Sequence, residues 1–88
     1  MPEVSDPVLE LFHVLADPSS AKVRRFVVDH GLEGALRFRS LTYPEVQADF
    51  SAHGGTTPPA LWDGERLVEG AEAVISRLLA YGDVGRAG

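Results

Sequence analysis

The stretch VLELFHVLADPSSAKVRRFVVDHGLEGALRFRSL, residues 8–41, decides the fold. It opens with residues 8–15, which are apolar at most positions, as in a strand that is buried on both faces of a sheet. A helix is expected from Asp17 and Pro18, because Asp caps a first turn and Pro fits the first helical position. Residues 36–41 alternate apolar and basic side chains, which is typical of a half-exposed strand. This order predicts two parallel strands joined by a right-handed crossover.

The rest of the chain predicts a further helix, a hairpin and a last helix. Residues 42–45 (TYPE) have the Thr-x-x-Glu spacing of a capping box, which predicts a helix beginning there. Asp63-Gly64 is the strongest two-residue hairpin signal in the chain, and residues 71–82 have the spacing of a helix that ends at a glycine. The predicted order is β-α-β-α-β-β-α, a three-layer α/β domain with a four-stranded mixed sheet. The first strand should lie inside the sheet, with the second helix alone on one face.

The composition narrows the class of protein. The 88 residues suffice for one domain, spanning 1–88 with an ordered part of about 8–81, and 44% of them are apolar. The net charge is −5 and the basic residues form no stripe, which disfavours nucleic-acid binding. Without cysteine there is no disulfide, thiolate nucleophile or thiolate metal site. Since no signal peptide or membrane-length apolar run is seen, a cytoplasmic domain with no membrane contact is expected.

Two segments resemble a known superfamily. Residues 17–25 (DPSSAKVRR) resemble the start of the first helix in glutaredoxins and in the N-terminal domain of glutathione transferases. Residues 57–64 (TPPALWDG), followed by 67–70 (LVEG), are similar to the transferase pattern Val-Pro-x-Leu-x-Asp-Gly and the pair that opens the third helix. The resemblance covers about residues 8–81, and it implies a thioredoxin-like fold of the glutaredoxin type.

The resemblance also implies a binding site. In that superfamily a cis proline, here Pro59 after Pro58, faces the start of the first helix. The backbone of the residue before it pairs with glutathione, whose γ-glutamyl end lies near the third helix. The site residues implied for this chain are Asp17, Ser19, Ser20, Pro58, Pro59, Glu69 and Gly70.

The chain departs from the superfamily where the chemistry would occur. Asp17 stands at the position of the nucleophilic Cys or activating Ser, and Ser20 at that of the resolving Cys. Pro58 has no N–H to donate to a ligand. The sequence therefore predicts a redox-inactive binding module without catalytic residues, which holds a peptide, a protein segment or, weakly, glutathione in the cis-Pro groove. The alternative is a glutathione-transferase-type enzyme that a partner chain completes. The natural ligand and the oligomeric state are left open.

Structural roles compete with the functional ones at several positions. For Asp17, capping the helix is favoured over catalysis, and a Ser-His-Asp triad of Ser20, His13 and Asp17 is disfavoured. The three histidines do not have metal-ligand spacing, so no metal site is expected. Packing is favoured over partner binding for Trp62. Glu69 is either a solvated charge or a group that orients a ligand amine.

Overall fold

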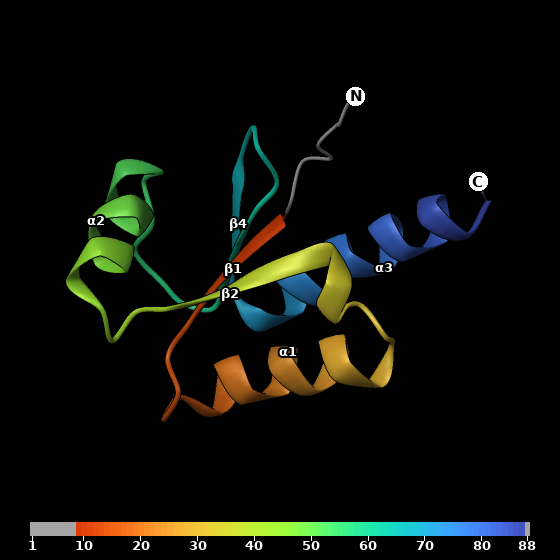
Figure 1. Cartoon of the computed structure of the whole chain (residues 1–88), viewed down its shortest axis with the longest axis horizontal. Coiled ribbons are helices and arrows are strands. Elements are labelled where there is room, and N and C mark those ends of the chain that lie inside the picture. The colour runs from red at the N-terminus through yellow and green to blue at the C-terminus, as the bar shows by residue number, and fades with distance from the viewer. Residues whose placement is uncertain (1–8, 88) are drawn as a thin grey trace.

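The computed structural model describes residues 9–87, and the side chains of residues 9–81. Its order of strands and helices is the one that the sequence predicts, with one short 3-10 turn, Glu33–Ala35, added before the second strand. The helices lie around one sheet (Figure 1). The elements are β1 (Leu9–His13), α1 (Pro18–Asp29), β2 (Leu36–Ser40), α2 (Pro44–Ala52), β3 (Ala60–Trp62), β4 (Leu67–Glu69) and α3 (Ala71–Ala87).

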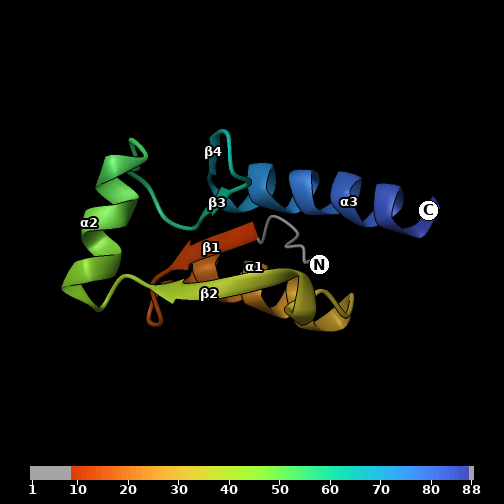
Figure 2. The same ribbon diagram turned by 45° about the horizontal axis from the view of Figure 1, so that its top comes forward.

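The sheet is open and mixed, with the strand order β2-β1-β3-β4 (Figure 2). β1 lies inside the sheet, as predicted. It pairs in parallel with β2 from Leu9↔Leu36 to the end of both strands, and antiparallel with β3, where Phe12 is opposite Ala60. β3 and β4 form the predicted antiparallel pair. Both β1 and β2 therefore end at the same edge of the molecule, where α1 and α2 begin.

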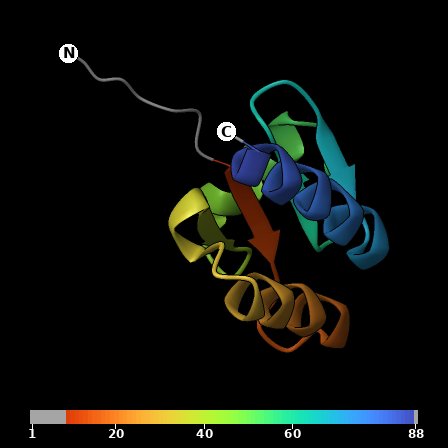
Figure 3. The same ribbon diagram turned by 90° about the vertical axis from the view of Figure 1, so that its right-hand side faces the viewer.

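The two faces of the sheet bury separate hydrophobic clusters. α1 and α3 lie on one face (Figure 3), where the larger cluster is formed. α2 packs against the other face, where Val46 and Phe50 meet Phe12 and Ala60. This arrangement confirms the predicted layers. The buried residues of the larger cluster are Leu9, Leu11, Val23, Val27, Leu36, Leu61, Val74 and Leu78.

The ends of three elements differ from the prediction. The first strand was expected over residues 8–15, but β1 stops at His13, because the N–H of Val14 donates to the Ser20 hydroxyl instead of to a neighbouring strand. Residue 8 lies outside the described residues. The prediction of a capping box at residues 42–45 is wrong, since Tyr43 is the N-cap of α2 and its side chain makes no capping hydrogen bond. α3 does not end at Gly82 but continues to Ala87. Glycine in a helix costs about 1 kcal/mol relative to Ala and does not by itself end it.

The hairpin between β3 and β4 has the expected position and a longer turn. Trp62 is opposite Leu67, so the turn has four residues rather than two. The Asp63 carboxylate accepts hydrogen bonds from the backbone N–H groups of Glu65 and Arg66, both at 2.9 Å. These bonds lower the pKa of Asp63 and close the wider turn around Gly64, whose φ is +100°.

Candidate functional site

Three segments are found at the end of the sheet where β1 stops: residues 14–20, 56–59 and 69–70, named here the loop end. The β1–β3 pairing ends at Phe12↔Ala60, so Pro59 continues the chain at the level of His13. The N–H of Gly70 donates to the Pro59 carbonyl at 2.8 Å. The carboxyl ends of strands in open α/β sheets are where ligands commonly bind. The Pro58–Pro59 bond is cis, which confirms that prediction.

The side chains of Asp17 and Ser20 form hydrogen bonds with each other at the start of α1. One Asp17 carboxylate oxygen accepts from both the N–H and the hydroxyl of Ser20 at 3.0 Å, and the same hydroxyl accepts from Val14 N–H at 3.1 Å. The favoured interpretation of Asp17 as the helix cap is confirmed. Ser20 is 0% exposed, whereas Ser19 is exposed. The helix N-terminus, which attracts anions, is thus already occupied by a carboxylate of this chain.

His13 and Arg24 lock the last residues of β1 onto α1. Arg24 donates to the His13 Nδ1 at 3.2 Å and to the carbonyls of Val14 and Leu15. Burial, with a smaller contribution from the Arg24 charge, lowers the pKa of His13. The imidazole is therefore neutral at pH 7 and accepts at Nδ1. Among the described residues His13 pairs with Arg24 while Ser20 pairs with Asp17, so these side chains do not assemble a triad.

Glu69 clamps the segment that precedes the two prolines. Its carboxylate accepts from the N–H of Thr56 at 2.6 Å and from the N–H of Thr57 at 2.9 Å. The two backbone bonds lower the pKa of Glu69. Neither of the two roles considered for Glu69 from the sequence describes this clamp. A hint was present in the sequence, since Thr56 and Thr57 stand before a rigid Pro-Pro pair and leave their amides to be satisfied elsewhere.

Few polar groups at the loop end remain open to a ligand. The Gly70 amide, which the resemblance assigns to glutathione, is taken by Pro59. Pro59 is buried and Pro58 is half-buried. No residue within 9–87 donates a hydrogen bond to the Pro58 carbonyl. Leu15, in the loop after β1, is 64% exposed. Besides the exposed Ser19, Thr56 and Thr57, the loop end thus offers a ligand the Pro58 carbonyl oxygen and the apolar side chain of Leu15.

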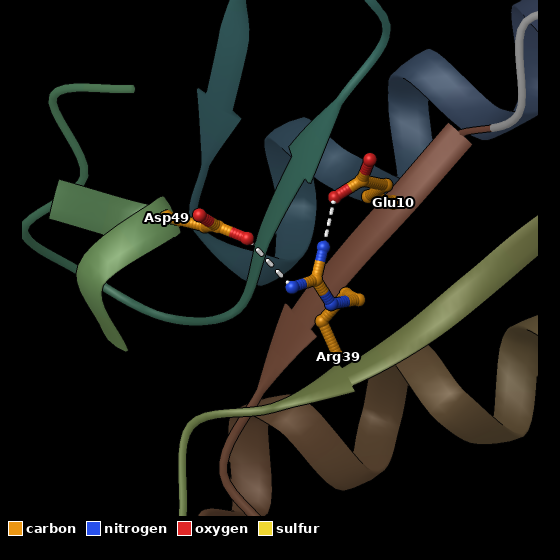
Figure 4. A network of polar contacts seen from close by, with 3 residues as sticks. All are labelled: Glu10, Arg39 and Asp49. Atoms are coloured by element: carbon orange, nitrogen blue, oxygen red, sulfur yellow. Dashed lines mark hydrogen bonds and ion pairs between the residues drawn. The ribbon is translucent and has the colours of Figure 1, made fainter. Parts of the chain in front are cut away.

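A second polar cluster, missed by the sequence analysis, lies on the α2 face of the sheet. Arg39 donates to Glu10 at 2.6 Å and to Asp49 at 2.7 Å (Figure 4). Its guanidinium lies 5.6 Å from the centre of the Phe12 ring. The bond to Asp49 and the charge of Glu10 raise the pKa of Arg39. The cluster ties β1, β2 and α2 together, which is a structural role.

Aromatic side chains complete the α2 face. The His53 ring stacks on Trp62, with centres 3.7 Å apart and an angle of 14° between the planes. Trp62 also packs against the cluster of Phe12 and Phe50, so the favoured interpretation of Trp62 as a packing residue is confirmed. His53 and His30 cap the C-termini of α2 and α1.

No protein-family model matches the chain, and a search of curated proteins found no match. Within residues 9–87, no three His, Asp or Glu side chains lie together as metal ligands would. In the same part of the chain, no helix has the length and apolar character required to cross a membrane.

Proposed function

We propose that this chain is a thioredoxin-like binding module without redox chemistry, which holds an extended peptide or protein segment against the loop end. The α/β order, the mixed sheet and the cis Pro58–Pro59 bond are compatible with this fold. The observation that carries the proposal is the state of Asp17 and Ser20. At the two positions where the superfamily has its reactive groups, a carboxylate and a buried hydroxyl bind each other.

Disulfide exchange needs a thiolate, and the chain contains none. A serine can attack only when a nearby base activates it. The Ser20 hydroxyl donates to Asp17 and is fully buried, so it does not reach a substrate. For the same reason the alternative function, a transferase completed by a second chain, has less support.

Glutathione is a weak ligand in this proposal. Asp17 places a negative charge where the ligand's sulfur would lie, and Pro58 offers no N–H. Each loss weakens binding by about 1 kcal/mol, or ~10- to 100-fold together. We expect a dissociation constant in the millimolar range or weaker. An extended protein segment depends less on these groups, because it can donate to the Pro58 carbonyl and cover Leu15.

The test is a titration of the ¹⁵N-labelled protein with reduced glutathione, followed by amide chemical shifts. We expect weak, saturable shifts confined to Ser19, Thr56, Thr57 and Gly70. Submicromolar binding, or conjugation of glutathione to a dinitrophenyl substrate, would contradict the proposal.

A pair of variants isolates the charge at the loop end. Asp17→Asn keeps a good helix cap while removing the charge, so it should bind glutathione several-fold more tightly. Asp29→Asn is the matched control, since Asp29 is exposed at the opposite end of α1 and the net charge changes equally. Equal affinities of the two variants would show that the ligand does not lie near Asp17.

A further inference from the structure

β2 is an edge strand of the sheet. It pairs with β1 on one side only, and no described residue pairs with its other side (Figure 2). Such an edge presents a row of backbone N–H and C=O groups that another extended segment can pair with. β2 has five residues, Leu36–Ser40, long enough to receive a short segment as a fifth strand. This surface is separate from the loop end.

The two sides of this edge differ chemically. On the α1 side, the Phe38 ring contacts His13 edge-on, with centres 5.7 Å apart, and remains 41% exposed. Arg24 reaches the same His13, and Val28, one helical turn further along α1, is 56% exposed. On the opposite side, Arg37 is exposed. A fifth strand would thus lay alternate side chains on apolar surface and beside Arg37, which forms no ion pair with another described residue.

Charge is distributed unequally around this edge. Residues 18–41, which contain α1 and β2, carry five basic and two acidic side chains, whereas the rest of the chain carries three basic and eleven acidic ones. Of these basic residues, Arg39 is paired with Glu10 and Asp49, which leaves Arg37 as the exposed basic side chain of β2. Antiparallel pairing of two copies about Phe38 would set Arg37 opposite Arg39, whose charge is already balanced by Glu10 and Asp49, so a second copy offers Arg37 no carboxylate. The charges favour an acidic partner over a second copy.

We propose that the free edge of β2 binds an extended acidic segment of a partner protein, in which acidic residues alternate with apolar ones. The backbone of the segment pairs with β2, its apolar side chains cover Phe38 and Val28, and its carboxylates face Arg37. Strand addition of this kind takes its affinity from main-chain hydrogen bonds and its specificity from alternate side chains. The proposal does not depend on the function assigned to the loop end.

The experiment titrates the ¹⁵N-labelled full chain with the peptide acetyl-Thr-Glu-Val-Glu-Val-Glu-Thr-amide. We expect shifts and slowed hydrogen exchange at residues 36–40. The control peptide has lysine in place of each glutamate and should bind at least tenfold more weakly. Absence of shifts in β2 at millimolar peptide, equal binding of both peptides, or shifts centred on residues 56–59 would overturn the proposal. Concentration-dependent association of the protein through β2 would also overturn it, in favour of a second copy.

Two variants with the same change of net charge distinguish a direct contact between Arg37 and the peptide from long-range attraction between the protein and the peptide. Arg37→Glu should weaken binding of the acidic peptide about tenfold, because reversing the charge of one cross-strand pair changes the free energy of binding by ~1–2 kcal/mol. Arg25→Glu, exposed on α1, alters the net charge equally and should weaken binding less than threefold. Arg37→Gln, which avoids the reversal, should give an intermediate loss if Arg37→Glu fails to fold. Equal losses in the Arg37 and Arg25 variants would refute the contact.

Discussion

Replacing Glu69 with Gln should loosen the segment before the two prolines without changing its shape. The carboxylate accepts the backbone N–H groups of Thr56 and Thr57 at 2.6 and 2.9 Å. Glutamine has nearly the same size but one acceptor oxygen and no charge. Glu69→Gln therefore removes one hydrogen bond to the backbone and weakens the other.

The magnitude follows from the kind of bond and its exposure. A hydrogen bond to a charged group contributes ~1.5–3 kcal/mol, and a neutral one about half as much. Thr56 and Thr57 are exposed, so water can replace the lost acceptor. After this discount we expect a loss of about 1 kcal/mol in the free energy of unfolding. For a domain of this size, that corresponds to a fall in Tm of roughly 4–8 °C.

Urea unfolding followed by the fluorescence of Trp62, the single tryptophan, measures the loss. The folded pKa of Glu69 lies below its ordinary value of 4.5, so its contribution is present above pH 4.5 and is lost as the pH falls through the folded pKa. The difference between wild type and Glu69→Gln should thus shrink on acidification. Glu65→Gln, a variant of an exposed turn residue, serves as the control. Equal stability at pH 7, or a difference that stays constant down to pH 3, would refute the reasoning.

Three further expectations concern the core, pH and redox chemistry. Gly55→Ala should destabilise the fold by ~1–3 kcal/mol in urea unfolding, because its Cβ would overlap the buried Phe50 ring; Gly34→Ala, with open space around it, should not. The folded pKa of His13 is lowered, so stability should fall as the pH is lowered through 6.5, and His13→Gln should lose this slope; an unchanged slope would contradict the assignment. The wild type should be inactive in disulfide reduction with glutathione and its reductase. The disulfide-reductase activity of Asp17→Cys should stay well below that of a glutaredoxin, because Pro58 stands where a backbone N–H would bind the disulfide. Full activity of this variant would show that the N–H is dispensable.

The local features of the fold could be predicted from the sequence, because their causes lie within a few residues. The start of α1 is an example, since Asp17 and Pro18 act on the turn that immediately follows. The order of elements followed in the same way from spacing. The prediction failed where two local signals competed. The Thr-x-x-Glu pattern predicts Thr42 as the N-cap of α2, whereas the turn after β2 makes Tyr43 the N-cap.

The interactions that define the candidate site could not be read from the sequence, because they join distant residues. Glu69 lies 13 residues from Thr56, and Arg39 lies 29 residues from Glu10. Which acceptor a backbone amide finds depends on how the sheet brings those segments together. The resemblance named Glu69 and Gly70 as ligand groups, whereas within the described chain both already bind the loop before β3.

The unequal size of the two hydrophobic clusters has a consequence for how the molecule opens. Among the residues whose side chains are described, eight buried ones hold α1 and α3 to the sheet and four form the cluster beneath α2. Free energies of local opening scale with the apolar contacts that are lost, so α2 is the first helix expected to detach. Residues 56–59 follow α2 directly along the chain. Because the Arg39–Asp49 ion pair joins β2 to α2, we expect opening of α2 to break this pair and to release residues 56–59, while the other two layers stay folded.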